Sequence, residues 1–253
     1  MNRSDCAYLI NTTPKYFYLL NLHITLLRRY APAMSWPIYL ATEEPEDPEI
    51  LKLNINILPL PKAKAGFFES REAALALLPD SIRYIFPIQE DFLLEGRPME
   101  TEIADALRIL DDDSQVRSIR LMPCPGPHEF DLPYKGSLWK ILDFDLDRLV
   151  FTYQATLWKR TPYQDFMKSL LHKTQHLNER QKISMAISVN IAEIPEGQII
   201  LRGHQGIHLA YPRSHPHPNA VYLCPWPYRP TAVVRGTLEP WASQLAEREG
   251  CPL

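Results

Sequence analysis

Hydrophobic and polar positions alternate in a regular order over the first 120 residues. Short apolar runs, as long as buried strands, are separated by longer segments in which apolar positions recur every three or four residues, as on one face of a helix. After the first run, for example, Phe17, Leu20, Ile24 and Leu27 fall on one helical face. The runs that predict strands are 7–10, 36–41, 55–58, 82–88 and 116–121, and the helical segments lie at 17–27, 70–78 and 103–110.

Strands that alternate with helices favour βαβ units and a parallel sheet. We therefore predict an α/β fold in which helices flank a mainly parallel mixed sheet. The second half is less regular, with a strand at 151–157, a helix opened by Thr161 and Pro162, and an irregular, Pro-rich C-terminal part. We expect one domain over residues 1–253, with a regular half at 1–125 and a less regular half at 126–253.

Composition and charge exclude several classes of protein. The 253 residues include 27 Lys and Arg against 30 Asp and Glu, and a net charge of −3 gives no electrostatic basis for binding nucleic acid. No apolar run approaches the ~18 residues of a membrane span. The four cysteines are far apart and form no CxxC pair, which favours reduced thiols and a cytoplasmic protein. The sequence contains neither GxGxxG nor GxxxxGK[ST], so dinucleotide-binding and P-loop folds are not expected.

Two adjacent acids, Glu90 and Asp91, directly follow the predicted strand 82–88. Open α/β sheets bind their ligands at the carboxyl ends of the strands. Carboxylate oxygens at that place suit Mg²⁺ or Mn²⁺ bound together with a diphosphate, whereas the alternative is an ordinary solvated loop. If the strand continues through this motif, Gln89 and Asp91 share one face and Glu90 points to the other.

Several strings give the chain a resemblance to a known family. YIFPIQEDFLL at 84–94, with WPIYLATEE at 36–44, YQATLWKRTPYQDFM at 153–167 and AVVRG at 232–236, resembles small GT-A-type glycosyltransferases of bacteria and viruses. The resemblance implies a GT-A-like fold, a DxD-like metal site at Glu90 and Asp91, and a nucleotide-sugar donor, a UDP-sugar above all. It also implies that the first half binds this donor and that the second half faces a glycan, lipid-linked or protein acceptor.

The resemblance further implies which residues surround the donor. The loop after the first strand and the end of the second strand would contact the nucleoside, residues 67–71 would bring an aromatic ring and Arg71 to it, and Trp158 would stack on a sugar ring. The residues expected at the donor are Asn11, Thr12, Thr13, Glu44, Ser70, Arg71, Glu90, Gln154 and Trp158. Structural roles are the alternatives: Thr13 and Ser70 as helix caps and Trp158 as a core residue.

The sequence also departs from the family pattern. The acids of QED are adjacent, whereas those of a DxD motif are one residue apart, and Asp91 is the expected direct metal ligand. About twenty residues after the Trp-Lys pair, where the related enzymes have acids that act as a base, the chain retains only Glu179, and Asp165 is the other candidate. A nucleotidyltransferase or sugar-nucleotide pyrophosphorylase is an alternative, although residues 11–14 lack the glycines of its N-terminal loop. A non-catalytic nucleotide-sugar-binding protein is another.

Overall fold

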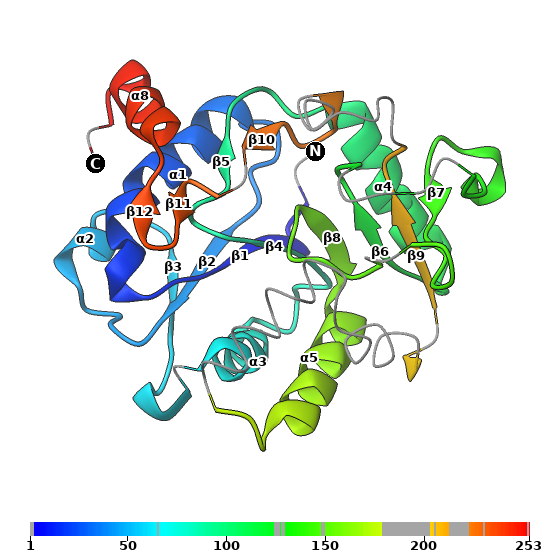
Figure 1. Ribbon diagram of the computed structural model, residues 1–253, viewed down its shortest axis with the longest axis horizontal. Helices are drawn as coiled ribbons and strands as arrows, with labels where there is room; N and C mark the ends of the chain where they lie inside the picture. The colour runs from blue at the N-terminus through cyan, green and yellow to red at the C-terminus, as the bar shows by residue number, and fades with distance from the viewer. Residues whose placement is uncertain are drawn as a thin grey trace.

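A computed structural model describes residues 3–64, 66–123, 127, 130–147, 150–178, 203–204, 206–212, 223–229, 231–251 and 253. Within them, eight strands form one sheet through the middle of the molecule (Figure 1). In spatial order the strands are β3 (Asn56–Pro59), β2 (Ile38–Thr42), β1 (Cys6–Asn11), β4 (Tyr84–Ile88), β8 (Thr156–Lys159), β6 (Val116–Arg120), β9 (Ile207–Ala210) and β7 (Lys140–Ile141).

The sheet is mainly parallel. Strands β3, β2, β1 and β4 are parallel neighbours, and β6 and β9 run in the same direction. Only β8 and β7 are antiparallel to their neighbours among the strands that the structure describes in this sheet. The expected α/β fold with a mainly parallel mixed sheet flanked by helices is confirmed.

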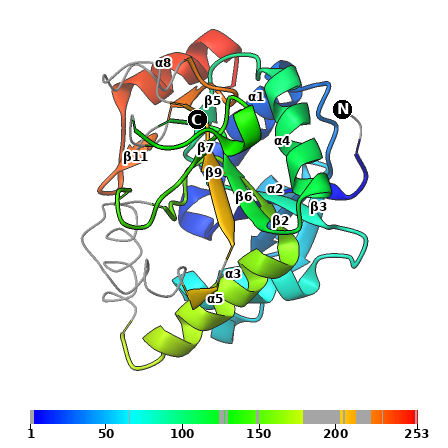
Figure 2. The ribbon, with the colours of Figure 1, turned by 90° about the vertical axis from the view of Figure 1, so that its right-hand side faces the viewer.

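Helices cover both faces of the sheet, as two perpendicular views show (Figures 1 and 2). One face carries α1 (Phe17–Tyr30), α4 (Glu100–Asp112) and α8 (Pro240–Glu249), and the other carries α3 (Phe67–Leu77) and α5 (Arg160–Thr174). Strand β1 serves both layers, because Tyr8 and Ile10 belong to one apolar cluster and Ala7 and Leu9 to the other. A strand buried on both faces is a continuous apolar run, which is how β1 was predicted.

Several boundaries differ from those predicted. The strand expected at 151–157 begins only at Thr156, because the preceding residues form a loop whose Phe151 and Tyr153 pack against the α3–α5 layer. Helix α3 begins at Phe67, so Ser70 lies within its first turn and is not its cap; the Ser70 hydroxyl donates instead to the Phe67 carbonyl oxygen at 3.3 Å. The sequence also favours a helix after Asn178 and a short strand at 199–201, and both lie outside the described residues.

The C-terminal part contains elements that its proline content did not predict. They are β10 (Tyr228–Arg229), which pairs with β5 (Leu93–Leu94) of the first half, the hairpin β11 (Val233–Val234) and β12 (Thr237–Leu238), and helix α8. Each pairs or packs against the first half, because α8 and Tyr228 belong to the same apolar cluster as α1. No helix in the part of the chain that the structure describes is long and apolar enough to cross a membrane.

The order of the strands reverses at β1. From β1 the chain builds outward through β2 and β3, and it then returns through α3 to add β4 on the other side of β1. In open α/β sheets this topological switch point leaves a crevice at the carboxyl ends of the two central strands, where ligands bind. The loops that follow β1 and β4 therefore border the position of a ligand.

The Arg160 side chain joins the two helices of the α3–α5 layer. Its guanidinium donates to the carbonyl oxygens of Leu75, Leu78 and Pro79 at 3.1, 2.9 and 2.6 Å, at the end of α3 where carbonyls lack helical partners. We predict that Arg160→Met, which keeps the apolar stem, lowers the free energy of unfolding by about 2 kcal/mol.

Urea unfolding measures this effect. The matched control is Arg108→Met, because Arg108 is 63% exposed and forms ion pairs with Asp105 and Asp112 on its own helix. We expect the control to change the free energy of unfolding by less than about 0.5 kcal/mol. Equal effects of the two substitutions would contradict the role of Arg160.

Candidate active site

The acidic motif after β4 forms a turn. The strand ends at Ile88, and the Phe92 N–H donates to the Gln89 carbonyl oxygen at 3.1 Å. The strand therefore does not continue through the motif, and the expected alternation of Gln89, Glu90 and Asp91 between two faces is wrong. Glu90 is only 8% exposed and Asp91 is half-buried, so the pair is not an ordinary solvated loop.

Burial changes the acidity of both carboxyl groups. It raises the pKa of Glu90 to about 7, and the neighbouring charge of Asp91 adds to this, while the Arg71 charge and a hydrogen bond from Thr12 act in the opposite direction. Burial also raises the pKa of Asp91 to about 6, against the effect of a hydrogen bond from the Val233 backbone. Two carboxylates with little solvent at a switch point favour a positively charged ligand between or beside them.

The hairpin of β11 and β12 is attached to this turn. The Ala232 N–H donates to the Asp91 carbonyl oxygen at 2.9 Å, in addition to the bond between Val233 and the Asp91 carboxylate. Its turn consists of Arg235 and Gly236, which have φ angles of 52° and 82°. Such positive φ angles are typical of tight hairpin turns, for which glycine is well suited.

A lysine side chain lies beside the hairpin turn. The Lys15 ammonium, on the single-turn segment η1 (Pro14–Tyr16) that follows β1, is 3.5 Å from the point where a Cβ of residue 236 would stand. The lack of a side chain at Gly236 leaves room for this approach. Sequence reasoning did not identify Lys15, and its position directly after the switch-point loop is the only signal that could have indicated it.

Four of the predicted donor residues meet at one small cavity between the end of β4 and the loop before β8. It measures about 20 Å³, roughly the space of one water molecule, and Asn11, Arg71, Gln154 and Trp158 contribute to its lining. The Asn11 side-chain amide donates to the Ser70 carbonyl oxygen at 3.2 Å, so the backbone of Ser70, rather than its hydroxyl, positions Asn11. The Gln154 side-chain oxygen accepts a hydrogen bond from the Tyr228 hydroxyl.

The aromatic residue expected near the nucleotide holds Arg71 instead. The Arg71 guanidinium lies 3.7 Å from the centre of the Phe67 ring and 5.2 Å from that of Tyr153, and it donates to the Phe67 carbonyl oxygen at 2.8 Å. These contacts fix the direction of the arginine, whose charge acts on Glu90. Arg71 is thus placed on the α3 side of the acidic turn.

Other predicted residues lie farther from the centre of the site or are covered. Thr13 is exposed at the start of η1 and makes no side-chain capping bond, and Glu44, at the end of β2, pairs with Lys62 at 2.8 Å. Trp158 is only 2% exposed and its ring packs against Phe166 and other aromatic side chains. The expected stacking of Trp158 on a sugar ring does not agree with this burial, and the core interpretation does.

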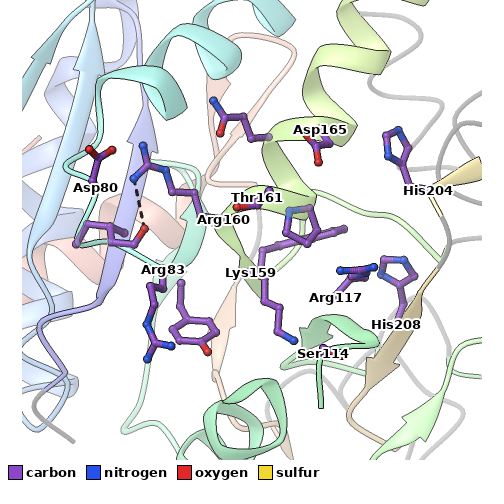
Figure 3. Close-up of a pocket in the computed structure, with 15 residues that line it drawn as sticks. Asp80, Arg83, Ser114, Arg117, Lys159, Arg160, Thr161, Asp165, His204 and His208 are labelled. Carbon is purple, nitrogen blue, oxygen red and sulfur yellow. Dashed lines mark hydrogen bonds between the residues drawn. The ribbon is translucent and has the colours of Figure 1, made fainter. Parts of the chain in front are cut away.

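The candidate base Asp165 does not lie at the acidic turn. Asp165 lines a different pocket, together with Asp80 and Arg83 at the amino end of β4 (Figure 3). Asp165 therefore lines a pocket at the amino end of β4, whereas Glu90 follows the carboxyl end of that strand. Glu179 lies outside the residues that the structure describes.

Comparison with solved structures shows a similar arrangement of strands and helices in other proteins. No protein-family model and no curated protein matches the sequence. Among solved structures, S. aureus TarS matches at a TM-score of 0.44 and 14% identity over 81% of this chain, which spans 57% of that structure. TarS in complex with UDP-GlcNAc matches at a TM-score of 0.40 and 15% identity, over 68% of this chain and 47% of the other.

A different enzyme shows a comparable likeness. The 4-diphosphocytidyl-2C-methyl-D-erythritol synthase of Anaerococcus prevotii matches at a TM-score of 0.41 and 9% identity, over 79% of this chain and 98% of its own. At such identities and TM-scores, these likenesses concern the arrangement of strands and helices and carry no information about a reaction. The function therefore has to be argued from the site.

The raised pKa of Glu90 has a consequence for stability. A glutamate in an unfolded chain ionises near pH 4.5, whereas the folded protein keeps the proton up to about pH 7, so raising the pH between these values favours unfolding. We predict that Glu90→Gln gains stability over the wild type by about 1 kcal/mol for each pH unit between pH 5 and pH 7.

The measurement is urea unfolding at several pH values in the presence of a chelator. Glu46→Gln removes a carboxylate at an exposed position outside the site and serves as the control. A difference between Glu90→Gln and wild type that stays constant with pH would contradict the assigned burial effect.

Proposed function

We propose that the protein is a metal-assisted glycosyltransferase that moves a sugar from a nucleotide-sugar, in the first instance a UDP-sugar, to an acceptor hydroxyl. The observation that carries this proposal is the pair of buried carboxylates, Glu90 and Asp91, at the topological switch point, in a sequence that resembles such enzymes. Nucleotides bind α/β sheets at this place, and a nucleotide diphosphate would bring negative charge to a site that already holds two acids. A bound cation resolves this conflict.

The donor atoms present fit Mg²⁺ or Mn²⁺. These ions are typically held by one or two protein carboxylates together with phosphate oxygens and water, rather than by a complete set of protein ligands. Within the described part of the chain, no group of three or more His, Cys, Asp or Glu side chains is placed to hold a metal ion. Asp91, the less buried acid, would be the direct ligand, with Glu90 beside it. A divalent ion here would supply charge neutralisation for the departing nucleoside diphosphate.

The chain's own residues suggest how the donor is oriented. Asn11 and Thr12, at the end of β1, would contact the nucleoside. The Asn11 amide is held by the backbone of α3, and the Thr12 hydroxyl is held by Glu90. The Lys15 ammonium lies beside the hairpin turn at Gly236, where its charge would favour the diphosphate, and Arg235 of the same turn would add a second cation. Because the hairpin is hydrogen-bonded to Asp91, donor and carboxylate would be positioned by one rigid connection.

Binding of a nucleoside diphosphate tests the metal assignment. We predict that UDP with Mn²⁺ raises the melting temperature by roughly 5 °C or more at saturation, and that UDP with a chelator has a much smaller effect. Uridine, which lacks the diphosphate, is the control ligand and should show no dependence on Mn²⁺. Equal shifts with Mn²⁺ and with chelator would rule out metal-assisted binding.

Substitution of each acid tests the mechanism. Asp91→Asn keeps an oxygen that accepts the Val233 N–H, so we expect the fold to persist while turnover of the nucleotide-sugar falls by about 10²-fold or more through lost charge stabilisation. Glu90→Gln should have a milder effect on turnover and act more on donor affinity. The readout is release of nucleoside diphosphate from a panel of nucleotide-sugars with Mn²⁺.

The same panel separates the alternatives. Near-normal turnover of Asp91→Asn in saturating Mn²⁺, with an inactive Glu90→Gln, would overturn the assignment of the two acids. Reaction with pyrophosphate would indicate a nucleotidyltransferase or pyrophosphorylase, and binding without turnover would indicate a nucleotide-sugar-binding protein. Either result would contradict the proposed transfer.

A further inference from the structure

A larger cavity lies at the opposite edge of the sheet from the acidic turn. It measures about 660 Å³ and opens between the amino ends of β4 and β6 and the first turns of α5 (Figure 3). We call it the amino-edge pocket. Its charged lining residues are Asp80, Arg83, Arg117, Lys159, Arg160 and Asp165, and the lining also contains His204, His208 and Thr161.

A break in the sheet places Arg117 at this pocket. Strand β6 pairs with β9 through Val116 opposite Ile207 and Ser118 opposite His208, so Arg117 is an extra residue, a β-bulge. Bulges change the direction in which a side chain points and occur preferentially near functional sites. The neighbouring Gly206 has a φ of 146°, and a side chain there would collide with the Arg117 stem. Two backbone features thus accommodate one arginine.

Lys159 brings a second cation into the same space. Its ammonium donates to the Asp113 carbonyl oxygen at 2.6 Å, which leaves further N–H groups of the ammonium for other acceptors. Burial, together with the charge of Arg117, holds the pKa of Lys159 below its usual value. Two cations in a partly desolvated space repel each other, and an anion between them relieves the repulsion.

The start of α5 adds to the positive potential. Because β8 runs antiparallel to its neighbours, the helix that follows it begins at the amino edge of the sheet. Helix α5 has 15 residues, and its N-cap residue, Lys159, makes no side-chain capping bond. The Thr161 side chain lies at the pocket next to this helix end, where N–H groups favour an anion.

Four further charged residues line the pocket. Arg83 pairs with Asp5 at 2.6 Å, and Arg160 is turned toward the Ile82 carbonyl oxygen, as Figure 3 shows. The acidic residues Asp80 and Asp165 stand on two different elements, before β4 and on α5, and Figure 3 shows both above Lys159 and Arg117. Counted over the whole lining, four cationic side chains stand against two acidic ones, and the charge of Arg117 acts on Lys159.

We propose that the amino-edge pocket binds the phosphate group of a small phosphorylated molecule. Arginine and lysine together match the several oxygens of a phosphate, and the Thr161 hydroxyl supplies a further donor. The cavity is many times larger than a phosphate ion, so it has room for the organic part of an ester such as a sugar phosphate. The pocket is separated from the acidic turn by the length of β4, about 16 Å, so the ligand is distinct from the proposed donor.

The test is calorimetric titration with α-D-glucose 1-phosphate and, in a separate arm, with inorganic phosphate, both in a chelator that suppresses metal-dependent donor binding. We expect saturable binding to one site per chain. Lys159→Met and Arg117→Gln should each weaken it by about tenfold or more. Tighter binding of the sugar phosphate would identify an organic ester, and equal binding would identify free phosphate as the ligand.

Lys135→Met is the matched control. The Lys135 ammonium donates to the Asp113 carboxylate at 2.7 Å, whereas Lys159 contacts the carbonyl oxygen of the same residue, and Lys135 does not line the pocket. We expect this control to change the affinity by less than about twofold. Melting curves show which variants are folded, and Arg117→Gln carries the test if Lys159→Met does not fold.

Three results would overturn the proposal. They are the absence of saturable binding up to about 10 mM ligand, an equal loss in Lys135→Met and Lys159→Met, and a loss of binding in Asp91→Asn, which would place the phosphate at the acidic turn. Failure of the proposed glycosyl transfer would leave phosphate binding in the chelator unchanged, so the two proposals fail independently.

Discussion

The reversal of strand order at β1 is the constraint on which the rest of the structure depends. Because β1 and β4 are parallel neighbours, their carboxyl ends meet at one edge, and the residues after them, Thr12 and Glu90, come into contact. The same reversal requires the chain to cross the sheet through α3, whose Arg71 faces the site. The burial of two carboxylates at this point is therefore a consequence of topology, and the raised pKa of each follows from that burial.

The C-terminal segment completes this site although it lies far away in the sequence. Backbone groups of residues 232 and 233 bind Asp91, the Tyr228 hydroxyl binds Gln154, and Arg229 pairs with Glu95 at 3.1 Å. These bonds cross from one end of the chain to its middle, so residues far away in the sequence hold this segment in place. A segment with little regular structure of its own can thereby position a carboxylate.

The antiparallel direction of strand β8 determines where the helix after it begins. Helices that follow parallel strands begin at the carboxyl edge of the sheet, while α5 begins at the amino edge because β8 runs the other way. The carboxyl edge carries the buried acids, and the amino edge carries Arg117, Lys159 and the start of α5. The two edges thus present different charged groups, and Trp158 on β8 contributes to the lining of both cavities.

The sequence by itself determined the βαβ pattern of the first 120 residues. Strands such as β1 and helices such as α1 show their type in the local spacing of their buried apolar residues, whichever element packs against them. It also placed Glu90 and Asp91 after a buried strand. Only the tertiary structure decided that the motif is a turn, that Trp158 is covered, that Asp165 lines a different pocket, and that Lys15 lies beside the hairpin turn at Gly236. These features depend on contacts between residues far apart in the sequence, and local periodicity carries no information about which distant segments meet.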